Sequence, residues 1–267
     1  MSTVEGTGID DTGHVLAQLT AAQWLLLGVA AVVVGFAKTA LGGVGGIAAV
    51  LFAMVLPARE STGALLPLLI AGDVLAVTLY RRHAQWGLLL RLLPWVVVGT
   101  VVGAGFVAVV DDRVMRVAIG VLLVLVSLLG LALRRSGLRN HLATDAVRGA
   151  PHLVAATLAG VLAGFATMVA NAAGPVTTLY LVLSGLAMLA FLGTTAWFFL
   201  IVNVIKVPFS LGLGLISAGS LLLDAILIPA LFVGAGLGVL LIRRISQARF
   251  EQYALSVSAV AAAMLLL

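Results

Sequence analysis

The amino-acid sequence predicts an all-α polytopic membrane protein made of two inverted repeats. Three observations support this fold class: an extremely apolar composition, a series of long apolar segments, and an internal repeat. The chain has 267 residues, of which 63% are hydrophobic and 9% are charged, and its mean hydropathy is +1.24. Because soluble domains carry about 25% charged residues, this composition excludes a soluble globular protein.

The apolar segments are long enough to cross a bilayer, since a membrane helix needs about 20 mostly apolar residues. We expect about eight long helical segments, at residues 15–38, 62–80, 87–110, 114–133, 151–170, 191–216, 220–242 and 251–267. Two shorter apolar segments, 43–57 and 173–186, follow breaks that are rich in small residues. Each half of the chain therefore contains a long segment, a break, a short segment and three further long segments.

Four matches in register indicate that the two halves are repeats of each other. At offsets of 129 to 131 residues, the matching pairs are Gly35-Phe36-Ala37 with Gly164-Phe165-Ala166, Gly63 with Gly193, Val102–Gly105 with Val233–Gly236, and Arg113 with Arg244. A single match between glycine-rich segments carries little weight. Four matches along the whole length indicate a duplication.

The loop cations favour an inverted relation between the halves, because Lys and Arg prefer cytoplasmic loops. If each pair of segments around a break returns to the side it came from, one side of the membrane receives 10 loop cations and the other receives 3. If each pair is instead one broken span, the halves are parallel and the division is 7 to 6. The larger bias favours inverted repeats, with both chain termini outside the cytoplasm.

The expected organisation has four parts: an acidic extracytoplasmic tail at 1–22, a first transmembrane repeat at 23–133, a cytoplasmic linker at 134–150, and a second transmembrane repeat at 151–267. Residues 1–14 contain three acidic residues and no Lys or Arg. This stretch lacks the basic start and the apolar core of a secretory signal.

The two breaks are the main candidates for a functional site. The first reads GFAKTALGGVGG (35–46) and the second reads GFATMVANAAGP (164–175). Glycine weakens a helix by about 1 kcal/mol relative to alanine, and proline suits the first turn of a new helix, so helices should stop and restart near 42–46 and 171–175. Restarting helices have free N–H groups and a positive dipole end, which attract anions.

Broken helices at matching positions of two inverted halves indicate a transport site near the middle of the membrane. The alternative is that these glycines only permit close helix packing.

Three charged residues are expected inside the membrane, and together they carry a net charge of +1. Lys206 lies about 15 Å from the nearer end of its segment at ~1.5 Å per residue, and Asn203 shares its helix face. Asp73 is the repeat counterpart of Asn203, and Lys38 lies in the first break. Because unpaired buried charges are costly, these groups need partners. The candidate solutions are an ion pair between Asp73 and one lysine, an anionic substrate, or a neutral lysine that would suit coupling to a proton.

The predicted substrate site combines both breaks with the segment at 191–216. Its candidate residues are Lys38, Thr39, Gly43, Gly45, Gly46, Asn171, Ala172, Ala173, Gly174, Thr194, Asn203 and Lys206, with Asp73 as a coupling or ion-pairing residue. Tyr80 is expected in the aromatic belt at the membrane interface, and Arg91 and Asp224 are expected close to an interface, where they would snorkel or cap a helix.

The same segments resemble the TauE/SafE family of membrane permeases, which comprises sulfite exporters and related organosulfonate carriers. In the first half the resemblance rests on GFAKTALGGVGG, on the helix that contains Asp73, on LYRRHAQW (79–86) and on LLRLLPW (89–95). In the second half it rests on TMVANAAGPVTTLYL (167–181) and GTTAWFFLIVNVIKVPFSLGLGLI (193–216). It covers nearly the whole chain after residue 20. Where the family often has GxGGG, this chain has GGVGG and NAAGP.

The resemblance implies a bacterial plasma (inner) membrane carrier of sulfur-containing oxyanions or small organic anions. The expected partners are a small anion, the lipid bilayer and, in some mechanisms, a coupling proton or ion. A homodimer is as compatible with the sequence as a monomer. A nucleic-acid partner is not expected, because the net charge of +5 is spread over short tracts between apolar segments.

The sequence supports two other functions less well. A channel or a proton- or cation-coupled carrier would be centred on Asp73. An enzyme is not expected, because no histidine lies deep in a segment, Asp73 lacks an evident acidic partner, and the chain contains no P-loop and no cysteine. No cofactor and no metal site are expected, since the four histidines are scattered without ligand spacing.

Overall fold

The computed structural model describes residues 19–41, 45–119, 121–122, 125 and 150–246, which are helical apart from turns and short connections. In chain order the elements are α2 (Ala21–Phe36), the π-helix η1 (Ala37–Leu41), α3 (Gly45–Val55), α4 (Ala58–Ala64), α5 (Leu66–Tyr80), the 3-10 helix η2 (Arg81–His83), α6 (Trp86–Val109), α9 (Ala150–Ala170), α10 (Gly174–Leu183), α11 (Met188–Gly212) and α12 (Ala218–Ile242). The expected segment at 251–267, most of the one at 114–133 and the linker at 134–149 lie outside the described residues.

Five helical stretches are long and apolar enough to cross a membrane, at Ala21–Ala40, Ala58–His83, Trp86–Val109, Met188–Gly212 and Ala218–Ile242. Shorter apolar helices include Gly46–Val55 and Ala156–Ala170. Large apolar side chains such as Leu25, Val102 and Phe232 are more than half exposed on the outside of the bundle, where a bilayer would cover them. The prediction of an all-helical polytopic membrane protein is confirmed.

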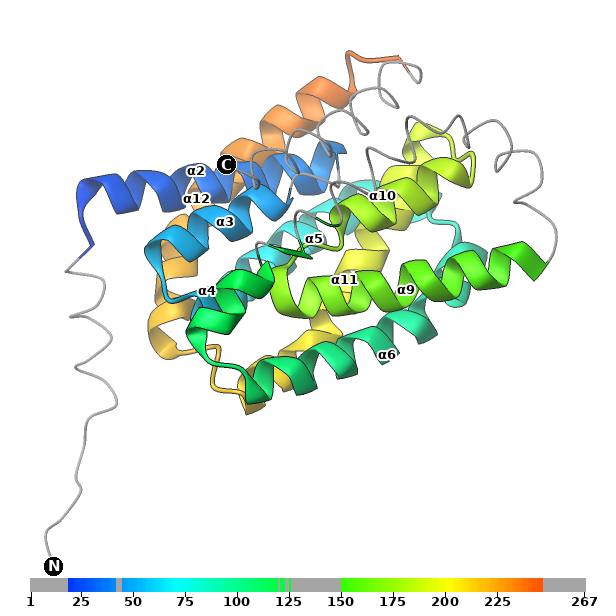
Figure 1. Cartoon of the computed structure of the whole chain (residues 1–267). Helices are drawn as coiled ribbons and strands as arrows, with labels where there is room; N and C mark the ends of the chain where they lie inside the picture. The colour runs from blue at the N-terminus through cyan, green and yellow to red at the C-terminus, as the bar shows by residue number, and fades with distance from the viewer. Residues whose placement is uncertain (1–18, 42–44, 120, 123–124, 126–149, 247–267) are drawn as a thin grey trace, which may run out of the picture.

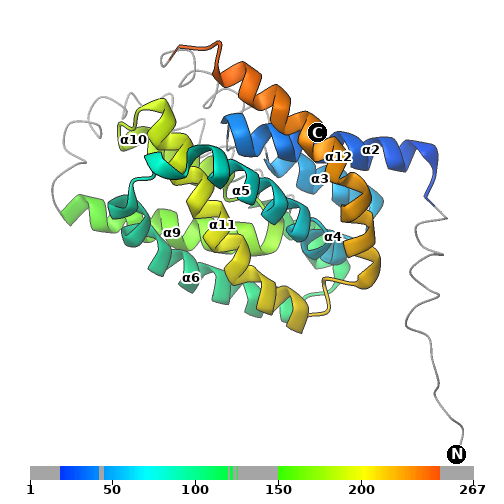
Figure 2. The ribbon, with the colours of Figure 1, turned by 180° about the vertical axis from the view of Figure 1, so that it is seen from behind.

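The long helices form three pairs, and every pair joins the two halves of the chain (Figure 1). Helix α2 packs along α12, α6 packs along α9, and α5 packs against α11 between the other pairs, as the reverse view in Figure 2 also shows. Glycines allow the close approach: a Cβ atom at Gly35 would overlap the backbone of Leu231, and one at Gly164 would overlap the backbone of Val96. The first helix of each half, α2 or α9, therefore packs directly on a long helix of the other half, α12 or α6.

Helices α5 and α11 run antiparallel, as three sets of contacts along them indicate. Gly63, just before α5, lies against Leu215, just after α11. In the middle, Asp73 is hydrogen-bonded to Asn203. At the other end, Gly193 near the start of α11 lies against the stretch 80–84 at the end of α5. Two helices that are counterparts in the sequence repeat thus point in opposite directions.

The other two pairs run parallel. In the first, Gly234 lies against Val32 and Gly238 lies against the backbone of Phe36. In the second, Gly99 lies against Val161 and Gly103 lies against Phe165. In both pairs, the contacts move toward higher residue numbers on the two helices together, which is the pattern of parallel helices.

Both predicted breaks divide short helices from long ones, and the chain turns back after each of them (Figure 1). In the first half, α2 passes into a π-helical turn before α3 begins at Gly45; residues 42–44 lie outside the described part. In the second half, α9 ends at Ala170 and α10 begins at Gly174, with Pro175 in its first turn. Asn171 adopts a left-handed conformation with φ of 51°, which asparagine tolerates better than most residues. The predicted stop and restart near 171–175 is confirmed.

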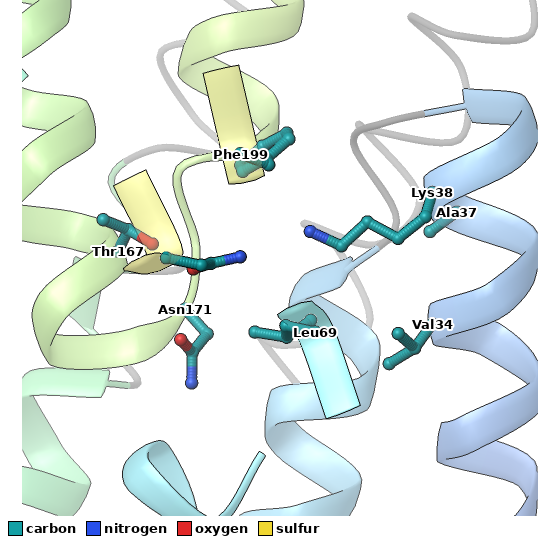
Figure 3. Close-up of a pocket in the computed structure, with 9 residues that line it drawn as sticks. Val34, Ala37, Lys38, Leu69, Thr167, Asn171 and Phe199 are labelled. Atoms are coloured by element: carbon teal, nitrogen blue, oxygen red, sulfur yellow. The ribbon is translucent and has the colours of Figure 1, made fainter. Parts of the chain in front are cut away.

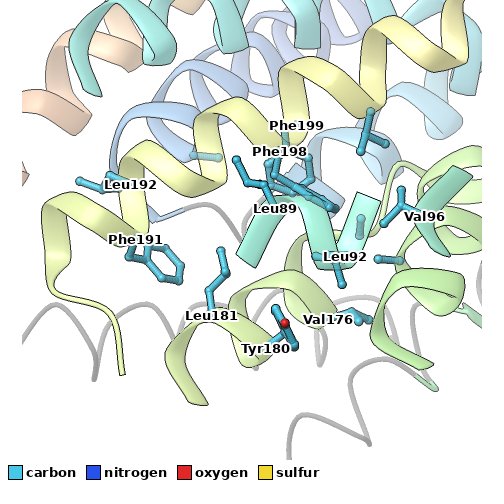
Figure 4. Packing of buried hydrophobic residues seen from close by; sticks show 14 of the residues in the cluster. Leu89, Leu92, Val96, Val176, Tyr180, Leu181, Phe191, Leu192, Phe198 and Phe199 are labelled. Atoms are coloured by element: carbon cyan, nitrogen blue, oxygen red, sulfur yellow. The ribbon is translucent and has the colours of Figure 1, made fainter. Parts of the chain in front are cut away.

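An apolar core surrounds these breaks. Leu89 and Leu92 of α6 pack with Tyr180 of α10 and with Phe191 and Phe198 of α11 (Figure 4). Because this core holds α11 against the second break, it fixes the position of the polar residues that α11 carries into the bundle.

Candidate functional site

A small cavity lies between the two breaks, α5 and α11 (Figure 3). It has a volume of about 20 Å³ and is lined by Val34, Ala37, Lys38, Leu69, Thr167, Asn171, Gly174, Phe199 and Asn203. A space of this size holds about one water molecule. Residues from both halves thus meet at one place, as the sequence predicted.

On one side of the cavity, Lys38 is bound to a buried carboxylate. Its Nζ lies 2.7 Å from Oδ1 of Asp73, a residue with no exposed surface. The other oxygen of Asp73 accepts a hydrogen bond of 2.7 Å from Nδ2 of Asn203. The ammonium group of Lys38 also lies 4.3 Å from the centre of the Phe199 ring, a distance at which a cation–π attraction operates. Asp73 is therefore the ion-pair partner of Lys38, which is one of the solutions expected from the sequence.

On the other side, Lys206 is bound only to uncharged groups. Its Nζ donates to the backbone oxygen of Thr167 at 2.8 Å and to Oδ1 of Asn171. The side chain is 1% exposed, and no carboxylate of the described residues forms an ion pair with it. Lys206 therefore brings a buried positive charge to the end of α9 without a countercharge.

The second break is also tied to the helix that precedes α5. Nδ2 of Asn171 donates to the backbone oxygen of Thr62 in α4 at 2.9 Å. Because its oxygen faces the ammonium group of Lys206 and its nitrogen faces a carbonyl, the orientation of this amide is settled by its partners. Asn171 thus links Lys206, the broken helix and α4.

The charges at the site do not cancel. Lys38, Asp73 and Lys206 interact with one another electrostatically, and Asp224, the other buried carboxylate of the described part, is not among their partners. With both lysines and the aspartate ionised, the cluster carries one positive charge in a region of low dielectric constant, where such a charge calls for a partner.

Four of the predicted site residues line the cavity, namely Lys38, Asn171, Gly174 and Asn203. Lys206 and Asp73 contact lining residues directly. Ala172 and Ala173 are fully buried between α9 and α10, and Gly46 is buried near the start of α3. Gly45 is the first residue of α3, and Gly43 lies outside the described residues.

The two predicted threonines serve the backbone instead of the cavity. The hydroxyl of Thr39 lies 3.0 Å from the carbonyl oxygens of both Gly35 and Ala235, so it joins η1 to α12. The hydroxyl of Thr194 donates to the carbonyl of Ala190 and accepts the backbone N–H of Gln85. Neither threonine lines the cavity.

Two further expectations need correction or refinement. Tyr80 is not an interfacial belt residue: it is 7% exposed, and its hydroxyl donates to the backbone oxygen of Thr39 at 2.9 Å. It therefore holds the first break in place. Asp224 is 4% exposed, beside the backbone of Leu68 at the start of α5, so it does not snorkel to a surface. Arg91 is exposed, as expected.

The sequence interpretation missed Thr167 and Phe199, which both line the cavity. Thr167 could have been found, because it is the repeat counterpart of Lys38 at an offset of 129 residues. Phe199 carries no such signal, since an aromatic residue in an apolar helix is ordinarily part of a core.

The comparisons with known proteins agree with the resemblance seen in the sequence. No curated protein and no solved structure matches the chain. The model of a protein family described as Sulfite exporter TauE/SafE matches residues 27–265, a range that includes all the residues lining the cavity. The chain therefore belongs to the TauE/SafE sulfite exporter family.

Proposed function

We propose that the protein is a secondary transporter of a small anion, with sulfite, an organosulfonate or a related sulfur oxyanion as its substrate. The family is one of membrane transporters of sulfur anions, and with the apolar helices it supports a multi-pass protein of the bacterial inner membrane. The observation that carries the proposal is Lys206, a buried lysine of α11 that has no countercharge and contacts the end of the broken helix α9 beside the cavity.

The proposed binding groups surround the cavity. Lys38 and Lys206 supply positive charge, and Asn171 and Asn203 supply hydrogen bonds. Gly174 lines the cavity as the first residue of α10, so the free N–H groups at that helix start are available to an oxyanion. The first break is proposed to contribute the corresponding N–H groups at the start of α3, which begins at Gly45.

Alternating access is the proposed mechanism, through movement of one repeat against the other. The antiparallel course of α5 and α11, together with their equivalence in the sequence repeat, supports an inverted arrangement. A cavity of about 20 Å³ is too small for a sulfur oxyanion, so substrate entry requires the breaks and α11 to separate. The acidic tail at 1–22, the linker at 134–150 and extracytoplasmic termini remain part of this proposal.

The first experiment measures uptake of radiolabelled sulfite by the purified protein in liposomes, with sulfate, sulfoacetate, acetate and chloride as competitors. The test variant is Lys206→Met, which keeps the length of the side chain and removes the charge. Thr195→Val on the same helix is the matched control, because its buried hydroxyl has no described partner and does not line the cavity.

We expect saturable uptake that sulfur oxyanions inhibit, and a loss of at least about 30-fold in Lys206→Met, which corresponds to about 2 kcal/mol. Thr195→Val should retain uptake. If folded wild-type protein takes up no anion, the proposal is wrong. Proton or cation flux that Asp73→Asn abolishes would then favour a channel or cation-coupled carrier centred on Asp73.

A further inference from the structure

Asn203 lines the cavity and carries a buried hydrogen-bond acceptor without a described partner. Its Nδ2 donates to Oδ2 of Asp73 at 2.7 Å, and a carboxylate paired with a lysine can only accept at that position. The amide is therefore fixed with Oδ1 turned away from Asp73. Oδ1 is buried and makes no hydrogen bond to any described residue, while the residue lines the cavity and is 1% exposed.

Such an acceptor favours a ligand with a hydrogen to donate. A buried carbonyl oxygen that stays unpaired costs free energy, whereas a ligand that donates to it recovers that cost. The discrimination is large in sites built this way, because an analogue without the donor leaves the protein group unpaired.

Lys38 supplies the opposite kind of group to the same cavity. An ammonium group has three N–H donors and no acceptor, and Asp73 takes one of them. In Figure 3 the end of the Lys38 side chain points into the space between Phe199, Asn171 and Leu69. The cavity thus offers a cationic donor for anionic oxygens and, from Asn203, a neutral acceptor.

The charge of the cluster limits the ligand further. With all three groups ionised, Lys38, Asp73 and Lys206 together carry one positive charge, which one negative charge on the ligand neutralises. A divalent anion would leave one uncompensated negative charge in the buried site, at a cost similar in kind to that of the unpaired lysine.

We infer that the cavity selects a monovalent oxyanion that carries its own hydrogen-bond donor, such as hydrogen sulfite or a hydroxyalkanesulfonate. Lys38 receives the anionic oxygens, and Asn203 accepts the hydrogen of the ligand and determines specificity. Divalent anions and donor-free sulfonates are disfavoured. This inference rests on the proposed anion transport and specifies the substrate class of the same site.

An isosteric pair of competitors tests the inference. 2-Hydroxyethanesulfonate and 1-propanesulfonate have the same charge and nearly the same shape, and they differ by a hydroxyl in place of a methyl group. Each is titrated against uptake of radiolabelled sulfite in liposomes, with sulfate as the divalent competitor. The proteins are the wild type, Asn203→Leu and Thr195→Val.

We expect the hydroxylated sulfonate to inhibit wild-type uptake at a concentration lower by about tenfold or more than the propyl analogue. Sulfate should be the weakest competitor of the three. In Asn203→Leu the ratio between the two sulfonates should fall toward one, and in Thr195→Val it should stay at the wild-type value.

Equal inhibition of the wild type by both sulfonates, or strongest inhibition by sulfate, would overturn the inference while anion transport itself stands. A ratio that Asn203→Leu leaves unchanged would overturn the role of Asn203. If Asn203→Leu does not fold, the ratio measured on the wild type decides. Wild-type protein that takes up no anion at all would contradict the proposed function and this inference together.

Discussion

The two breaks occupy matching positions in the halves of the chain, and a lysine lies at each of them. The partners of these two lysines differ. At the first, a π-helical turn carries Lys38, which has the carboxylate of Asp73 as partner. At the second, a left-handed Asn171 ends the helix, and Lys206 has only neutral oxygens as partners. The first break is therefore charge-compensated and the second is not.

This difference gives two similarly packed halves an asymmetric centre. The packing of the break-bearing helices is the same in both halves, because Gly35 fits against α12 as Gly164 fits against α6. The side chains at the centre differ: Asp73 faces its own counterpart, Asn203, at the antiparallel crossing of α5 and α11. A second carboxylate in place of Asn203 would balance the two lysines of the cluster. The neutral amide of Asn203 instead leaves the ionised cluster with one positive charge.

The largest expected effect comes from removing the carboxylate at the first break. Asp73→Asn leaves Lys38 and Lys206 as two buried cations without a countercharge. We expect the free energy of unfolding to fall by about 3–5 kcal/mol, measured by chemical denaturation in detergent micelles.

Two comparisons control this experiment. The double variant Lys38→Met/Asp73→Asn should recover most of the lost stability, because it removes the stranded charge at the first break. Lys206→Met should cost only about 1–3 kcal/mol, since it strands neutral acceptors and no charge. An Asp73→Asn cost no larger than that of Lys206→Met would contradict the distinction between the two breaks.

A second, smaller effect tests what the two halves share. Gly35→Ala in α2 and Gly164→Ala in α9 each force a Cβ atom into the backbone of the facing helix. We expect both to lower stability by about 1–3 kcal/mol through overpacking, measured by thermal unfolding in micelles of one detergent.

Each glycine has a control on a helix of the same pair. At Gly28 in α2 and Gly105 in α6 an added Cβ atom meets nothing within 4 Å. Alanine at these positions should be neutral or stabilise by up to about 1 kcal/mol. If only one of the two buried glycines were sensitive, the equivalence of the two packed pairs would be lost.

Much of the fold follows from local properties of the sequence. Apolar length predicted the long helices, and the Asn-Ala-Ala-Gly-Pro stretch predicted where α9 stops and α10 restarts. Matching glycines pointed to equivalent positions, and six of these eight glycines lie at close helix contacts, whereas Gly105 and Gly236 have open space around them. Such features are predictable because each depends on backbone conformation or on residue size over a few positions.

The side-chain partners were harder to predict, because they depend on which face of a membrane helix looks inward. In a segment that is apolar all round, no hydrophobic stripe marks the buried face. Tyr80 therefore resembled an interfacial residue, although its hydroxyl reaches the backbone of the first break. Thr39 and Thr194 resembled ligand-binding residues, although their hydroxyls reach carbonyls four residues earlier in their own helices, a common local bond for threonine.

The smallest expected effect comes from a substitution that makes the second break resemble the first. Asn171→Asp keeps the size of the side chain and places a carboxylate beside Lys206, so both lysines would then have acidic partners and the cluster would carry no net charge. We expect the apparent affinity for sulfite to fall by about tenfold, or about 1.4 kcal/mol, in the liposome uptake assay. The protein should remain folded, because the new ion pair offsets the loss of the Asn171–Thr62 hydrogen bond.

Asn171→Gly is the control, because glycine tolerates the positive φ and removes the same bonds without adding charge. A smaller loss of affinity in Asn171→Asp than in Asn171→Gly would mean that the amide contacts, and not the uncompensated charge of Lys206, attract the anion.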